Sequence, residues 1–110
     1  MAFDEALAAR VREVVGELTD DEFAEQRMFG GLAFLVAGHM AVAASREGGL
    51  LLRVDPRDTD RLIARTGAAP FRMRGRPIDG WLHIDAKDVR SRPRLERWVA
   101  RGVRYAQALS

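Results

Sequence analysis

The stretch from Leu32 to Ser45, LAFLVAGHMAVAAS, determines the kind of sheet that this protein forms. Two apolar runs, residues 32–37 and 40–45, flank the dipeptide Gly38-His39. Apolar runs on either side of a two-residue loop are typical of a β-hairpin, and glycine at the first loop position favours a type II′ turn. We therefore expect two neighbouring antiparallel strands here.

The register of this hairpin predicts that both of its faces are apolar. With Ala37 opposite Met40 and Leu35 opposite Val42, the side chains of Leu35, Met40 and Val42 share one face. A solvated antiparallel sheet normally alternates apolar with polar residues, so something must cover each side. The cover is either the protein's own helices or a second subunit. Leu35, Met40 and Val42 are therefore the candidate dimer or partner face.

Further elements are expected on both sides of the hairpin. Apolar residues recur at spacings of three and four over residues 3–18, which predicts a helix. The pattern then predicts an edge strand over 22–28, a strand over 50–54, a helix from Asp55-Pro56 to Gly67, strands over 70–73 and 78–85, and a helix from Ser91 to about Leu109.

Clustered strands between helices favour an α+β fold over a parallel, doubly wound one. We expect a single domain over residues 1–110 with two layers. Its antiparallel sheet has five to six strands and its helices number three, in the order α-β(3-4)-α-β(2)-α.

The composition excludes several kinds of chemistry. The 110 residues are 47% hydrophobic and 31% charged, as in an ordinary globular domain. Cysteine is absent, which excludes disulfides, thiolate nucleophiles and zinc sites with sulfur ligands. His39 and His83 are the only imidazoles, and His83, in a predicted strand, suits a hydrogen-bonded structural role. We expect no catalytic residue, no metal and no cofactor.

Residues 28–45 form an 18-residue stretch without a formal charge, close to the length of a membrane-spanning helix. Gly30, Gly31 and Gly38 interrupt the stretch, and a buried hairpin explains the same residues. The first residues, Met-Ala-Phe-Asp-Glu, lack the basic start of a secretory signal. We expect a cytoplasmic protein that does not contact membranes.

Charge is segregated along the chain. Residues 1–25 hold eight acidic side chains against two arginines, whereas residues 86–110 hold seven basic side chains against two acidic ones. On the last predicted helix, four arginines fall within an arc of roughly 80°. These four residues, here named the arginine stripe, are Arg94, Arg97, Arg101 and Arg104.

Two interpretations of the arginine stripe stay open. With Trp98 and Tyr105 at its border, the stripe suits nucleic acid or an acidic protein. Alternatively, the arginines form a solvated face that pairs with the acidic first helix, and the two aromatic rings mark the edge of the core.

The segment Met28-Phe29-Gly30-Gly31 also has two interpretations. Adjacent glycines let a backbone approach a bound group closely, which suits a ligand or partner loop. A phosphate loop is not indicated, because neither a Lys-Ser/Thr pair nor a dinucleotide fingerprint follows. We prefer a structural bend or bulge that seats Phe29 in the core.

Five short segments carry a resemblance to a known family. They are Met28-Phe29-Gly30-Gly31, the hairpin around Gly38 and Met40, Leu51-Leu52-Arg53-Val54-Asp55, Pro70-Phe71 and Gly80-Trp81. Their order and spacing resemble the N-terminal domain of the TfoX/Sxy family, bacterial proteins named for a regulator of natural competence. The resemblance implies a single α+β domain without known catalytic residues. Full-length competence regulators of the family carry a second, helical domain, to which no part of this sequence corresponds.

These observations together favour a non-enzymatic regulatory or protein-interaction module, which acts as a homodimer or with a protein partner. The alternative is a nucleic-acid-binding accessory protein that uses the arginine stripe.

Overall fold

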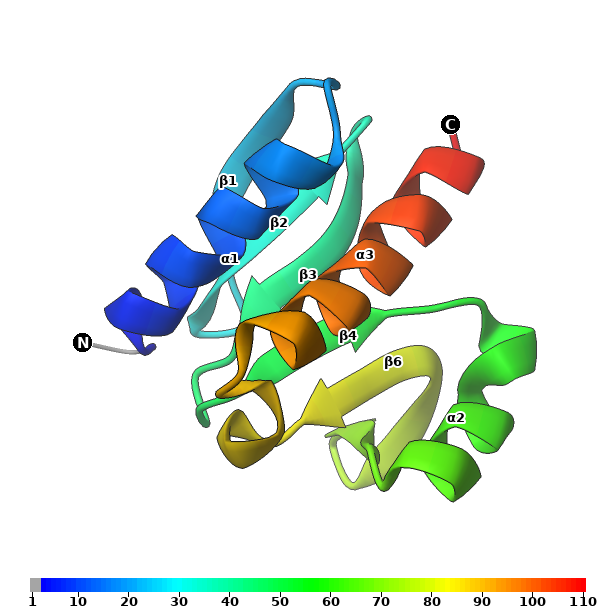
Figure 1. Ribbon diagram of the computed structural model, residues 1–110. Helices are drawn as coiled ribbons and strands as arrows, with labels where there is room; N and C mark the ends of the chain where they lie inside the picture. Colours follow the sequence, from blue (N-terminus) through cyan, green and yellow to red (C-terminus); the bar gives the residue numbers. More distant parts are fainter. Residues whose placement is uncertain (1–2) are drawn as a thin grey trace.

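The computed structural model describes residues 3–110, which form an antiparallel sheet with helices packed on one face (Figure 1). The elements are α1 (Glu5–Leu18), β1 (Phe23–Met28), β2 (Gly31–Val36), β3 (His39–Ala44), β4 (Leu50–Arg53), α2 (Thr59–Thr66), β5 (Ala69–Met73), β6 (Arg76–Ile84) and α3 (Arg92–Ala108). Two short 3-10 helices, η1 (Pro56–Asp58) and η2 (Ala86–Val89), precede α2 and α3. The six strands are ordered β1-β2-β3-β4-β6-β5. The predicted α+β fold and element order are confirmed.

The helices begin and end at the residues that helix chemistry favours. The Asp4 carboxylate accepts a hydrogen bond from the Leu7 N–H at the start of α1, and the Ser91 hydroxyl accepts one from the Arg94 N–H at the start of α3. Asp55 caps η1 rather than α2 itself, while Gly67, with φ of 75°, ends α2 as predicted. These caps determine the residues at which the helices begin or end.

The main core lies between the sheet and the helices. In Figure 1, α1 and α3 cross the near side of the sheet side by side, and α2 packs against β5 and β6. The largest fully buried side chains of this core come from α1, α3, the four central strands and the residue that follows β4: Val11, Val14, Val15, Phe34, Val36, Val42, Leu50, Leu52, Val54, Leu82, Ile84 and Leu95. Burying this apolar surface is the principal favourable contribution to folding.

Helix α3 lies close to the sheet at Gly102. A Cβ atom built at this position would lie 2.4 Å from the carbonyl oxygen of Ala41 in β3. A residue with any side chain would therefore push the helix away from the strand. This contact fixes the rotation of α3, and with it the direction in which the arginine stripe points.

The register of the central hairpin differs from the prediction by one residue. Its turn consists of Ala37 and Gly38, whose φ angles of 52° and 82° are both positive, as a type I′ turn requires. His39 is therefore the first residue of β3 and pairs with Val36. Leu35 lies opposite Met40 instead of Val42.

A bulge at Ala41 then changes the face on which Val42 lies. The pairing shifts between Phe34 and Leu35, so that Val42 pairs with Phe34. Val42 is fully buried beneath the helices, and so is Ala41. The prediction that Val42 shares a face with Leu35 and Met40 is wrong, because a two-residue alternation does not continue through a bulge.

The opposite face of the sheet carries a smaller apolar cluster made of strand residues alone. Ala33, Met40, Ala43 and Leu51 are buried at its centre. Met28, Leu35, Phe71 and Trp81 surround them and remain partly exposed. Over the described residues, the helices thus cover one face of the sheet, and strand side chains shield the other only in part.

Candidate interaction site on helix α3

The arginine stripe lies on the outer side of α3. Arg94, Arg97 and Arg104 are exposed and Arg101 is half-buried, while Leu95, Val99 and Ala106 of the same helix are completely buried. The helical period therefore places the apolar and basic residues on different sides of α3, as the sequence predicts.

Two of the acidic residues of α1, Glu13 and Glu17, are paired with Arg92, which lies outside the stripe. The Arg92 guanidinium donates hydrogen bonds to Glu13 at 2.9 Å, Glu17 at 2.7 Å and Glu96 at 2.8 Å. These hydrogen bonds, with that to Glu13 the largest cause, raise the pKa of Arg92 above its ordinary value. Arg92, and not the arginine stripe, therefore pairs with the acidic first helix.

The four stripe arginines form no ion pair with a carboxylate among the described residues. None of Arg94, Arg97, Arg101 or Arg104 takes part in an ion pair within residues 3–110. The predicted pairing of the stripe with the acidic first helix is therefore wrong. The stripe instead leaves four guanidinium groups, each with several N–H donors, available to an acceptor.

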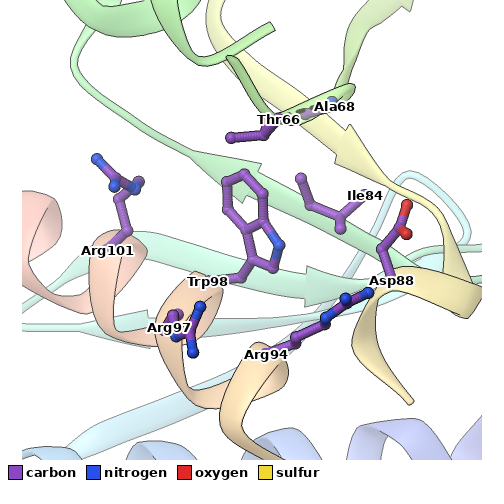
Figure 2. A pocket seen from close by; sticks show the side chains of 8 residues that line it. All are labelled: Thr66, Ala68, Ile84, Asp88, Arg94, Arg97, Trp98 and Arg101. Carbon is purple, nitrogen blue, oxygen red and sulfur yellow. Dashed lines mark hydrogen bonds between the residues drawn. The ribbon is translucent and has the colours of Figure 1, made fainter. Parts of the chain in front are cut away.

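A hollow of about 340 Å³ lies beside the stripe and is shown in Figure 2. Its lining consists of Thr66, Ala68, Ile84, Asp88, Arg94, Arg97, Trp98 and Arg101. In Figure 2 the indole of Trp98 extends from α3 toward Thr66 and Ala68, and Arg94 extends toward Asp88. Because Trp98 is half-buried against the core, one part of its ring supports the fold and another remains open to the hollow.

A second, shallower hollow of about 420 Å³ lies on the other side of the stripe. Leu18 of α1 and Pro93, Glu96 and Ala100 of α3 line it, together with three stripe arginines. Arg97 and Arg101 line both hollows and therefore form the ridge between them. Leu18 is 41% exposed, so this side of the ridge also offers an apolar contact.

A further cationic residue, Arg53 at the end of β4, is not part of the predicted site. Its guanidinium lies 5.4 Å from the ring centre of Trp81 and 5.8 Å from that of Tyr105. These distances allow cation–π contacts with both rings. Tyr105 therefore borders Arg53 rather than the hollow beside Trp98. The pairing of Arg53 with Trp81 depends on the strand register, which the sequence does not give.

The structure places the remaining candidates apart from the stripe. Leu35 is half-buried and Met40 is 5% exposed, both on the sheet face away from the helices. Met28-Phe29-Gly30-Gly31 forms the turn between β1 and β2. Phe29 is 53% exposed, so the prediction that it sits in the core is wrong. Its backbone has a positive φ of 53°, which is uncommon for a bulky residue.

Histidine and acidic side chains do not assemble into a metal site within the described chain. The Nε2 atom of His83 lies 2.8 Å from the carbonyl oxygen of Gly48. A carbonyl oxygen can only accept a hydrogen bond, so Nε2 carries the proton. The predicted structural role of His83 is confirmed. Among the described helices, none is both long enough and apolar enough to span a bilayer.

Comparison with known families identifies the domain. Residues 15–106, from within α1 to the last turns of α3, match the TfoX N-terminal domain. This chain belongs to the TfoX N-terminal domain family. TfoX N-terminal domains are regulatory rather than enzymatic domains. Comparison with curated proteins finds no match.

Proposed function

We propose that this TfoX N-terminal domain is a non-enzymatic regulatory module that binds an acidic segment of a partner protein along the arginine stripe. The observation that carries this proposal is the absence of any ion pair at Arg94, Arg97, Arg101 and Arg104 within residues 3–110. Arginine side chains form bidentate, charge-assisted hydrogen bonds with carboxylates, so a row of them suits an acidic chain.

The charge distribution supports a short acidic segment over an extended polyanion. The net charge of the chain is only +2, and the acidic helix α1 packs directly beside α3. A long duplex laid across α3 would also meet the carboxylates of α1, which repel phosphate. A peptide that follows the ridge of Arg97 and Arg101 avoids that repulsion.

Single-stranded nucleic acid is the second candidate, and Trp98 favours it. An indole that opens into a hollow between Arg94, Arg97 and Arg101 offers a stacking surface beside phosphate contacts. Such binding releases counterions, so its affinity falls steeply as salt increases.

Fluorescence anisotropy separates these candidates. We would titrate the protein into a labelled peptide of alternating Glu and Ala, a labelled single-stranded oligonucleotide and a labelled duplex, each at low and physiological salt. The proposal predicts saturable binding of the peptide. Tighter binding of the single strand would favour the second candidate, and no binding at low salt would contradict both.

A matched pair of variants locates the site. Arg97→Glu with Arg101→Glu should abolish binding with little effect on thermal stability, because neither side chain forms an ion pair within the part of the chain that the structure describes. Arg65→Glu with Arg76→Glu reverses the same number of charges at exposed positions outside both hollows and should retain binding. Equal losses in the two double variants would show that net charge, not the stripe, determines binding.

Homodimer formation remains a prediction. Of the three residues on which it was based, Val42 is buried beneath the helices and Met40 is nearly inaccessible. Leu35 is the one that retains substantial exposure. Light scattering at tens of micromolar, a concentration typical of weak association, tests whether the chain forms a dimer.

A further inference from the structure

A third hollow lies on the sheet face opposite to the arginine stripe and is suited to a ligand. It measures about 270 Å³ and is here named the Phe29 pocket. Apolar side chains, together with the first residue of β2 and the last two residues of β3, form much of its lining: Met28, Phe29, Gly31, Ala43, Ala44, Leu51, Phe71 and Met73. Ser45, Arg46, Glu47, Arg72 and Arg74 complete it.

Curling of the sheet closes this pocket. Phe29 follows β1 and Phe71 lies on β5, and β1 and β5 are the two edges of the sheet. At about 4.8 Å between neighbouring strands, a flat six-stranded sheet would hold its edge strands about 24 Å apart. The rings of Phe29 and Phe71 nevertheless lie 6.2 Å apart between their centres. The two edges thus meet through one aromatic pair, which forms a wall of the pocket.

The turn that carries Phe29 has a constrained backbone. Phe29 and Gly30 have φ angles of 53° and 77°, and a positive φ is unfavourable for a bulky residue. A Cβ atom on Gly30 would lie 2.6 Å from Cδ of Arg46, so the arginine stem lies against the bare glycine. Gly31 is equally constrained, since its Cβ would lie 2.3 Å from the carbonyl oxygen of Ala44.

Two large apolar side chains that line the Phe29 pocket are unusually exposed to solvent. Phe29 is 53% exposed and Met73 is 39% exposed, although both are large apolar side chains. Neither contributes its full area to the fold of the described chain, and each lies at the mouth of a concave surface. Exposed apolar groups around a hollow mark a place where a partner buries them.

The rim of the Phe29 pocket is basic. Arg46, Arg72 and Arg74 are exposed and form no ion pair within residues 3–110, and Glu47 is the one acidic residue of the lining. Arg72 donates a long hydrogen bond of 3.4 Å to the carbonyl oxygen of Gly75, and its charge remains unbalanced. The rim therefore favours an anionic partner.

We propose that the Phe29 pocket binds an extended peptide of a partner protein in which an apolar side chain is flanked by acidic residues. The apolar side chain enters between Phe29, Phe71 and Met73, and the carboxylates contact Arg46 and Arg74. A volume of 270 Å³ is just below the range of about 300–1,000 Å³ for small-molecule sites, and suits one or two side chains. A second copy of the chain is disfavoured, because a two-fold interface would bring the basic rim against itself.

This proposal does not depend on the arginine stripe. Helix α3 packs on the other face of the sheet, so the two surfaces can be altered separately. A partner could occupy either surface without the other.

The test uses a labelled peptide of sequence Asp-Glu-Leu-Phe-Glu-Asp, together with its counterpart in which lysine replaces every acidic residue. Phe29→Asn removes the ring but keeps the turn, because asparagine tolerates a positive φ better than phenylalanine does. Arg74→Asn likewise removes a charge at a position with φ of 54°. Each variant should weaken binding of the acidic peptide by about tenfold or more, while Arg65→Asn, an exposed arginine outside the pocket, should leave it unchanged.

Thermal unfolding of each variant confirms that the domain is folded. Equal binding of the lysine counterpart, or unchanged binding by Phe29→Asn, would overturn the proposal. Loss of peptide binding in Arg97→Glu with Arg101→Glu, but not in Phe29→Asn, would assign the peptide to α3 and also overturn it. A dimer that Phe29→Asn dissociates would assign the pocket to a second copy instead.

Discussion

Arg92 of α3 and Glu17 of α1 form an ion pair with a distance of 2.7 Å between Nη2 and Oε2. The same guanidinium contacts Glu13 and Glu96, so one residue at the start of α3 forms ion pairs with three carboxylates. The arginines farther along the helix are thereby left without acidic partners among the described residues. This division of roles makes the outer side of α3 a candidate binding surface.

The two kinds of arginine on α3 should differ in their effect on stability. Arg92→Gln removes three ion pairs and leaves Glu13 and Glu17 close together, so it should lower the unfolding free energy by more than the same change at Arg94 does. Arg94→Gln should change it by less than about 0.5 kcal/mol. Urea unfolding of both variants measures this difference, and high salt should reduce the effect of Arg92→Gln. Equal effects would contradict the assignment of ion pairs.

Two glycines within helices should respond in opposite ways to the same substitution. Gly16→Ala in α1 meets no atom closer than 3.9 Å and should stabilise the protein by up to about 1 kcal/mol through helix propensity. Gly102→Ala would place its Cβ 2.4 Å from the Ala41 carbonyl oxygen and should cost more than about 2 kcal/mol. Thermal unfolding of the two variants tests the close approach of α3 to β3. Stabilisation by both would show that this approach is wrong.

The backbone at Phe29 predicts a ranking of substitutions. Phe29→Asn should leave the melting temperature unchanged or raise it, because Asn-Gly is a preferred type I′ sequence. Phe29→Val should lower the stability by about 1–2 kcal/mol, since a β-branched residue tolerates a positive φ poorly. Calorimetry of the two proteins measures the order. A less stable Asn variant would indicate that the ring of Phe29 contributes more to the fold than its exposure suggests.

Acid should weaken the contact between α1 and β1. The Arg12 guanidinium donates two hydrogen bonds to the Glu25 carboxylate. These hydrogen bonds are the main reason why the pKa of Glu25 lies below its ordinary value of 4.5. A carboxylate with a lowered pKa in the folded state stabilises the protein above that ordinary value, and the contribution disappears as pH falls through the lowered pKa.

The variant Glu25→Gln isolates this contribution. Above pH 4.5 it should be less stable than the parent protein by under about 1 kcal/mol, because both side chains are partly exposed. The difference should shrink in more acidic solution and vanish once Glu25 is protonated. Unfolding free energies measured over a pH series provide the comparison, and a difference that grew with acid would contradict the ion pair.

The fold could be predicted largely from short-range patterns. The periodicity of α1, the start of α3 at Ser91 and the glycine that ends α2 depend on residues a few positions apart, so the sequence reveals them directly. The register of the central hairpin could not be predicted in this way, because it depends on which two residues form the turn. Gly38 is the second turn residue rather than the first, because Ala37 adopts a positive φ, which is uncommon for alanine.

In the candidate site, too, some features follow from short-range sequence patterns and others depend on the folded structure. Helical spacing identified the arginine stripe, since exposed positions on one helix follow from sequence alone. The sequence could not assign Glu13 and Glu17 to Arg92, because that pairing depends on the rotation of α3 set by Gly102. The meeting of Phe29 with Phe71 depends on the curl of the whole sheet, a property of six paired strands.

A two-dimensional NMR titration tests the central claim most directly. The labelled nuclei are the arginine Nε–H groups and the Trp98 indole N–H, and the added molecule is the peptide of alternating Glu and Ala. We predict saturable shifts of Arg97, Arg101 and Trp98, with Arg92 and Arg65 little changed. Shifts that are absent, or that spread equally over all arginines, would show that the stripe is a solvated helix face and not a binding site.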